Sequence, residues 1–277
     1  MARTETCSIC GGKVAFWDQG RILRKYDIAY YRCEECGFIQ SENPYWLSEA
    51  YASAINRSDV GYVSRNFGFG RAVRLLLDRC FDAKGQFLDY GAGYGMFVRH
   101  MRDMGYEFYG YDAHCVSLFA PDFLREARSP ERYELVTAFE VFEHLVDPVA
   151  DLRRIFDLTD SLLFSTFLLP RQTPKTNEWW YYGLDHGQHV SFYSATTVKK
   201  IGEMLGCNAY HLNDSLHLLT RRNLHPQLLR LLGKRKLQGL YALFPQRRSL
   251  LPKDHAFVLE LLETQEAAKV SLSSHEL

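Results

Sequence analysis

Short apolar runs alternate with amphipathic segments through the middle of this 277-residue chain. Four runs have the length and apolar content of buried strands, namely Gln86–Tyr90, Glu107–Tyr111, Tyr133–Phe139 and Ser161–Leu168. Between them, Tyr94–Met104 and Val149–Leu158 carry apolar residues at helical spacing. Strands that alternate with helices predict an α/β fold with a Rossmann-like, doubly wound and mostly parallel sheet.

The same pattern continues toward the C-terminus. Ala195–Leu205 is expected to be a helix that Ser194 caps and Gly206 ends. Two further apolar segments, Asn208–Asn213 and Leu216–Leu219, predict a terminal strand pair. These segments make six candidate strands, and the sheet as a whole is expected to have seven.

Composition divides the chain into three parts. Residues 1–43 are rich in cysteine and glycine, which predicts a small N-terminal zinc-binding module. Residues 44–221 begin with a helical pattern over 44–80 and then hold the alternating strands and helices. Residues 222–277 are expected to form a C-terminal helical extension outside the sheet.

The chain turns on three glycines directly after the first predicted strand, in the pattern Asp89-x-Gly91-x-Gly93-x-Gly95. Glycines allow unusual backbone angles and a close approach by a ligand, and the helix that follows presents free N–H groups. In open α/β sheets this carboxyl edge is the usual ligand site. A dinucleotide-binding loop would have its third glycine at residue 96, where this chain has Met96. That difference argues against a nicotinamide-dependent oxidoreductase.

This loop resembles the first motif of class I methyltransferases that use S-adenosylmethionine (AdoMet). Asp112 ends the second predicted strand, 23 positions after Asp89, where a carboxylate can accept hydrogen bonds from ribose hydroxyls. The resemblance implies that AdoMet is the methyl donor. The AdoMet-binding residues that it implies are Asp89, Tyr90, Gly91, Gly93, Tyr94, Gly95, Asp112, Phe139 and Glu140.

Two later stretches strengthen the resemblance. Residues 133–148 are similar to the superfamily segment that lines the acceptor side of AdoMet, and residues 185–194 are similar to the segment before its last helix. The layout, with a zinc-ribbon-like segment first, resembles methyltransferases of sugars and nucleotide sugars, so a small polar acceptor is expected. The chain departs from the family over 113–132, which is short for the usual helix and strand on the adenine side.

Three histidines are candidates for the general base of methyl transfer, because an unperturbed imidazole titrates near neutral pH. His144 follows the third predicted strand, and His186 and His189 lie in the loop after the fourth. Glu140 is a further catalytic candidate. As an alternative, Glu140, Glu143, His144 and His189 resemble the divalent-metal site of small-RNA 2′-O-methyltransferases, in which a metal binds and acidifies a hydroxyl.

Four cysteines form two CxxC pairs, Cys7 with Cys10 and Cys33 with Cys36, separated by 22 intervening residues. This arrangement suits tetrahedral zinc coordination by four thiolates. Four protein ligands leave no open position on the metal, so we expect a structural zinc. The chain shows no export signal, which disfavours disulfides.

The chain has 33 basic and 33 acidic residues, and a formal net charge of zero argues against a globally basic nucleic-acid binder. Residues 221–248 are locally basic, so a non-catalytic protein that binds AdoMet or RNA stays open as an alternative. No segment has the length of a membrane span, and we expect a cytoplasmic protein without membrane contact. The sequence does not indicate the acceptor, the methylated atom or the oligomeric state.

Overall fold

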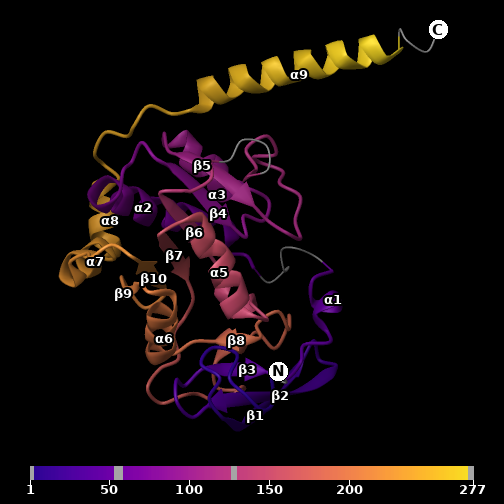
Figure 1. Ribbon diagram of the computed structural model, residues 1–277, viewed down its shortest axis with the longest axis vertical. Coiled ribbons are helices and arrows are strands. Elements are labelled where there is room, and N and C mark those ends of the chain that lie inside the picture. Colours follow the sequence, from indigo (N-terminus) through magenta and orange to yellow (C-terminus); the bar gives the residue numbers. More distant parts are fainter. Residues whose placement is uncertain (1–2, 53–58, 126–129, 274–277) are drawn as a thin grey trace.

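A computed structural model describes residues 3–52, 59–125 and 130–273 of the chain (Figure 1). Its central sheet has the strand order β5-β4-β6-β7-β10-β9. The strands are β4 (Gln86–Tyr90), β5 (Glu107–Tyr111), β6 (Leu135–Ala138), β7 (Ser161–Ser165), β9 (Asn208–His211) and β10 (Leu216–Thr220). The pairs among β5, β4, β6 and β7 are parallel, whereas β10 runs antiparallel to both of its neighbours. The predicted α/β fold with a mostly parallel sheet is confirmed.

The described residues give this sheet six strands, whereas the sequence pattern predicted seven. The difference lies at the β5 edge, where the family resemblance implies another strand. There Leu124 forms a single parallel bridge to Gly110, and the chain does not continue as a ladder within the described residues. Residues 126–129 lie outside the description.

Helices cover both faces of the sheet. Strand residues alternate between the faces, so that Phe87 packs with α2 (Tyr62–Cys80) and α3 (Met96–Asp103). The next residue, Leu88, packs with α5 (Pro148–Leu158) and α6 (Ala195–Leu205). This double winding buries both faces, so that every residue of the central strands β6 and β7 is buried.

The predicted limits of α6 are also confirmed. Ser194 accepts a hydrogen bond from the backbone N–H of Thr197, and Gly206 ends the helix in the left-handed conformation. The helical pattern over 44–80 corresponds to α1 (Leu47–Ala50) and α2, with residues 53–58 outside the description.

A second sheet contains the cysteine-rich segment. Its strands are β1 (Val14–Ile22), β2 (Tyr26–Cys33), β3 (Ile39–Ser41) and β8 (Ser191–Phe192), in that order and all antiparallel. β8 comes from the distant loop that carries His189, and Ile39 pairs with Phe192. The predicted module of residues 1–43 therefore shares its sheet with the segment that carries two of the candidate catalytic histidines.

The C-terminal extension contains α7 (Pro226–Leu232), α8 (Arg235–Tyr241) and α9 (Leu251–Ser273). α7 contacts β9, and α8 packs on α2. The base of α9 is fixed to α3 by Asp254, which is buried and pairs with Arg102 at 2.6 Å and Arg99 at 2.9 Å. From there α9 projects away from the body (Figure 1). None of the described helices has the length and apolar character needed to cross a membrane.

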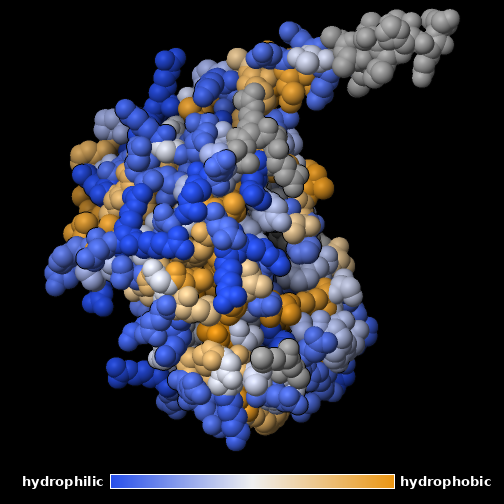
Figure 2. All heavy atoms as spheres, viewed as in Figure 1, coloured by the Kyte–Doolittle hydropathy of each residue, from blue (hydrophilic) through white to orange (hydrophobic). Residues whose placement is uncertain are grey.

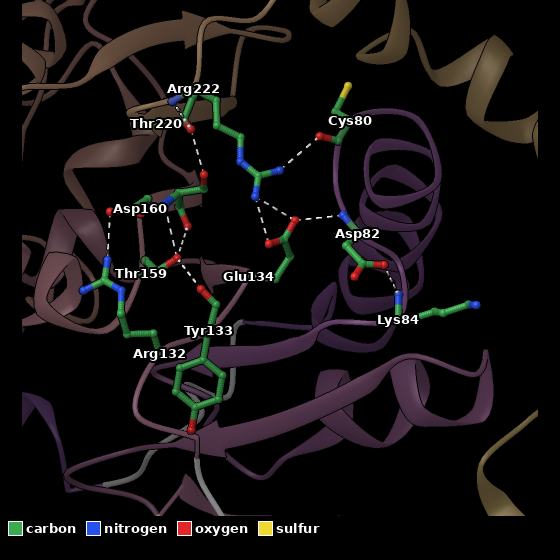
Figure 3. A network of polar contacts seen from close by, with 11 residues as sticks. Cys80, Asp82, Lys84, Arg132, Tyr133, Glu134, Thr159, Asp160, Thr220 and Arg222 are labelled. Atoms are coloured by element: carbon green, nitrogen blue, oxygen red, sulfur yellow. Dashed lines mark hydrogen bonds and ion pairs between the residues drawn. The ribbon is translucent and has the colours of Figure 1, made fainter.

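Ion pairs join the chain segments at the amino ends of β6 and β7, the end of the sheet opposite the glycine loop (Figure 3). Both carboxylate oxygens of Glu134 lie 2.8 Å from the Arg222 guanidinium, and one of them also accepts the backbone N–H of Asp82. Asp160 pairs with Arg132 and with Arg221. The first two cations of the basic stretch are therefore joined to acids of the sheet domain.

Candidate active site

A cavity of about 630 Å³ opens at the carboxyl ends of β4, β5 and β6, within the size range of small-molecule sites. It brings together most of the residues that the sequence singled out: Asp89, Gly91, Gly93, Tyr94, Asp112, Phe139, Glu140, Glu143, His144, His186 and His189. Predicted donor-side and acceptor-side residues thus share one space.

The glycine loop has the backbone conformation that its sequence predicts. Gly91, Gly93 and Gly95 have φ angles of 77°, 54° and 79°, in the left-handed region that side chains rarely adopt. A Cβ atom on Gly91 would also meet the side chain of Val141. Gly95 lies at the start of α3 behind the cavity wall, where a Cβ would meet Ser117, so it shapes the loop and does not line the cavity.

Asp112 ties this loop to the end of β5. One carboxylate oxygen accepts the backbone N–H of Gly93 at 2.8 Å. The other accepts those of His114 and Cys115 at 2.8 and 2.9 Å. A carboxylate has about four lone-pair positions, so three are filled by the protein and about one is left for a ligand hydroxyl.

Asp89 lies at the end of β4 and is only 4% exposed. One of its carboxylate oxygens accepts a hydrogen bond of 2.7 Å from the Thr137 hydroxyl. The pKa of Asp89 is raised to about 7, mainly by burial; the Thr137 hydrogen bond opposes this rise and the nearby Asp112 adds to it. Asp89 therefore supports the loop from beneath as a carboxyl that titrates near neutral pH.

The two tyrosines of the loop lie in different places. Tyr94 lines the cavity, whereas Tyr90 packs against Tyr111 with ring centroids 5.1 Å apart, outside it. Successive strand residues point to opposite faces of the sheet. Because the Asp89 side chain faces the cavity, the Tyr90 side chain points away from it. Phe139 lines the cavity and stacks on Phe69 at 4.2 Å.

Glu140 has a φ angle of 53°, which is uncommon for a residue other than glycine. Its backbone N–H donates to the Ser165 hydroxyl, which in turn donates to one Glu140 carboxylate oxygen, both at 2.7 Å. The other oxygen lies 3.4 Å from Nε of Arg65. Backbone strain of this kind gathers at functional sites, and here two partners hold the carboxylate at the cavity wall.

Hydrogen bonds assign different roles to two of the candidate bases. Nδ1 of His189 lies 2.6 Å from the Tyr181 carbonyl oxygen, which can only accept, so Nδ1 carries the proton and Nε2 keeps its lone pair. In His186 the opposite holds, because Nδ1 accepts the backbone N–H of Gln188 at 3.1 Å. The neutral His186 ring is therefore a hydrogen-bond donor through Nε2, and the neutral His189 ring is a hydrogen-bond acceptor through Nε2.

Glu143 is fully buried beside two imidazoles. Among the described residues, neither of its carboxylate oxygens has a hydrogen-bond partner. One of its oxygens and one nitrogen each from His144 and His189 lie within 4.8 Å of one another. Burial, and then the neighbouring His186, lowers the pKa of His144 to about 3, so this ring is neutral. Such a set of neutral imidazoles and a carboxylate is suited to a divalent cation.

The motifs missed one wall of the cavity, which comes from α2. Tyr62, Arg65, Asn66 and Phe69 all line it, and their spacing of three and four residues places them on one helix face. A stripe of polar and aromatic residues on a helix that packs beside a glycine loop is the signal that could have identified them. The motifs also missed Tyr51, whose hydroxyl lies 2.8 Å from Nδ1 of His144.

The four predicted zinc ligands come together at the ends of β1 and β2. Sγ of Cys7 lies 3.7 Å from Sγ of Cys36, and Sγ of Cys10 lies 3.5 Å from Sγ of Cys33. A tetrahedron with Zn–S bonds of about 2.3 Å has edges of about 3.8 Å. The thiols are too far apart for disulfides, and their arrangement fits a structural zinc.

This ribbon and α1 are joined directly to residues 187–197, the segment that includes His189. The carbonyl oxygen of Cys36 accepts hydrogen bonds from the hydroxyls of Ser194 and Thr197, at 2.7 and 2.9 Å. Just beyond the ribbon, Nε1 of Trp46 donates to the Gly187 carbonyl at 2.7 Å. The side-chain amide of Gln188 donates to the carbonyl of the α1 residue Ala50 at 2.8 Å.

A family profile described as a methyltransferase domain matches residues 64–212, which is more than half of the chain. The chain belongs to this methyltransferase family. The match spans the glycine loop, most of the residues that line the cavity, and the histidines His144, His186 and His189. The protein is an AdoMet-dependent methyltransferase, and Gly91 and Gly93 of its glycine loop line the cavity.

Several solved methyltransferases are similar to this methyltransferase. Magnesium protoporphyrin IX methyltransferase from Synechocystis, solved with bound SAM, is 14% identical to this chain, with a TM-score of 0.38. The match covers 64% of this chain and 90% of the Synechocystis chain. Human N-acetylserotonin methyltransferase in complex with SAM is 16% identical (64% and 66% covered, TM-score 0.40). A Haloferax volcanii methyltransferase, solved with its activator Trm112, is 15% identical (63% and 98% covered, TM-score 0.43). No curated protein matches the chain.

Proposed function

We propose that this methyltransferase methylates a hydroxyl oxygen of a small polar acceptor such as a sugar or a nucleotide-linked sugar. The observation that carries the proposal is the unprotonated Nε2 of His189 in the cavity that also contains the glycine loop. AdoMet supplies a methyl group activated by the positive charge on its sulfur. A hydroxyl that forms the new O–C bond must lose its proton, and His189 is the group that can take it.

The acceptor side supports a polar, ring-shaped substrate. Trp180 lines the cavity and is 72% exposed, so its indole face is available for stacking. Asp185 and His186 line the cavity as well, and they can bind hydroxyls as acceptor and donor. Holding the acceptor hydroxyl in line with the methyl group contributes to the rate by orientation.

A second candidate mechanism uses a divalent cation at Glu143, His144 and His189. The buried Glu143 carboxyl favours it, because neither of its oxygens has a hydrogen-bond partner among the described residues. Burial raises the pKa of Glu143 to about 8, and a bound cation would stabilise the carboxylate form. Nδ1–H of His189 donates to a backbone carbonyl, as metal-binding histidines usually do. Glu140 is engaged with Ser165 and Arg65, so three ligands replace the four expected from the motif.

His189→Gln tests the first mechanism. With a panel of sugars and nucleotide sugars as acceptors and mass spectrometry of the products, we expect kcat to fall by about 100-fold or more, while affinity for S-adenosylhomocysteine is unchanged. His186→Gln is the matched control, and it should raise KM more than it lowers kcat. An unchanged kcat in His189→Gln would refute the role of His189, and methylation of nitrogen or carbon would refute O-methylation.

Metal analysis separates the two mechanisms. In the first, the protein carries only the ribbon zinc, and activity survives EDTA treatment that leaves this zinc in place. In the second, the protein binds a further metal ion, and Glu143→Gln abolishes binding of that ion. EDTA treatment then removes activity, and added metal restores it.

A further inference from the structure

The C-terminal extension carries an apolar surface that nothing in the described chain covers. Five large apolar side chains of α7, α8 and the turn after α8 are exposed, with exposed fractions from 40% for Leu228 to 81% for Leu243. Its apolar members are Leu228, Leu231, Leu240, Leu243 and Phe244. Because this surface also carries the arginines and lysines described next, we call it the basic face. Exposed apolar side chains on two helices that contact each other are typical of an interaction site.

The charge of this surface has one sign. Residues 221–250 contain eight arginines and lysines and no aspartate or glutamate. Arg221 and Arg222 are paired with acids of the sheet domain. Four others are exposed on α7, on α8 and in the turn between them, namely Arg230, Lys234, Arg235 and Lys236. A partner for this face must therefore be apolar and acidic.

The projecting part of α9 has the complementary chemistry. Beyond Phe257, which still packs near Phe123, Leu259 and Leu262 are exposed by 48% and 49%. Glu260, Glu263 and Glu266 lie beside them, and residues 257–266 contain no arginine or lysine. Figure 2 shows hydrophobic residues next to hydrophilic ones where this helix leaves the body.

The projecting helix does not reach the basic face of its own chain. Figure 1 shows α9 running away from α7 and α8, and its base is held in that direction by Asp254 and Arg102. Most helical stability in proteins comes from tertiary packing of an apolar face, so a partner that covers Leu259 and Leu262 would stabilise the projecting part of α9.

We propose that α9 of one chain docks on the basic face of a second copy, and that the exchange is reciprocal. The resulting homodimer has twofold symmetry, buries Leu259 and Leu262 against the exposed leucines of the partner, and places glutamates opposite arginines and lysines. Pairing of two α9 helices with each other would bring like charges together. An RNA would match the cations of the basic face but not its leucines.

Charge reversal tests the proposal on the full chain. One variant carries Glu260→Lys, Glu263→Lys and Glu266→Lys, and the other carries Lys234→Glu, Arg235→Glu and Lys236→Glu. By light scattering, the wild type should have twice the 32.1-kDa mass of one chain. Each variant alone should be monomeric, with a dissociation constant raised about tenfold or more. A mixture of the two should form a heterodimer, because both docking contacts are then complementary again.

The controls keep each outcome decisive. Unchanged affinity for S-adenosylhomocysteine shows that each variant is folded, since none of the substituted residues lines the cavity. Leu262→Asp, an independent change, should also give a monomer. A monomeric wild type, open polymers, or two variants that each dimerise alone would overturn the reciprocal exchange. Binding of RNA or anionic lipid by a monomeric wild type would assign the basic face to that partner instead.

Discussion

Asp112→Asn is expected to weaken cofactor binding by a predictable amount. The Asp112 carboxylate accepts three backbone N–H groups, from Gly93, His114 and Cys115. If the amide oxygen of asparagine keeps the bonds to His114 and Cys115, its NH₂ group faces the N–H of Gly93, and two donors then meet. The bond that holds the glycine loop is lost together with the negative charge offered to the ribose.

A hydrogen bond to a charged group contributes about 1.5–3 kcal/mol. Loss of one such bond corresponds to a dissociation constant about 10- to 150-fold higher. Titration calorimetry with S-adenosylhomocysteine measures this directly, with Asp122→Asn as the matched control because Asp122 does not line the cavity. A folded Asp112→Asn protein that binds within about threefold of wild type would refute the assigned role of Asp112.

Three further predictions concern stability and the zinc ribbon. Cys33→Ser should release one zinc per chain by metal analysis and speed amide exchange over residues 187–197, while affinity for S-adenosylhomocysteine is retained. Asp254→Ala should lower the free energy of unfolding in urea by about 3–5 kcal/mol, because the buried Arg102 loses its partner. The pKa of Asp89 is about 7 in the fold, against 3.8 for the free side chain. The folded state thus binds this proton more tightly than the unfolded state. The free energy of unfolding should therefore decrease as the pH rises from about 4 to 7, and it should decrease less steeply in Asp89→Asn.

The donor half of the site could be predicted from sequence because its determinants are local. Gly91, Gly93 and Gly95 require left-handed backbone angles that few other residues adopt, and Asp112 ends the adjacent strand. The loop, its strand and its helix therefore follow from a short stretch of chain.

The acceptor half could not be predicted in this way, because its roles depend on distant partners. His189 and His186 lie three residues apart, yet a carbonyl from Tyr181 and an N–H from Gln188 give them opposite tautomers. The pairing of β8 with β3 was missed for a related reason, since two residues are too few to show a strand pattern. Tyr90 was placed at the donor because motif position does not specify which face of a strand a residue occupies.

The pairing of β3 with β8 means that the ribbon sheet cannot be completed until a much later part of the chain has been synthesised. All four cysteines precede the segment that carries His189, so the ribbon can take up zinc before that segment is synthesised. Its edge partner Phe192 follows Ile39 by about 150 residues, which corresponds to roughly 8–30 s of translation. During that interval β3 is an open strand edge, a common starting point for aggregation. This edge becomes covered only when residues 185–194 have been synthesised. Their strand β8 then pairs with β3, and the same segment completes the cavity wall that contains His189.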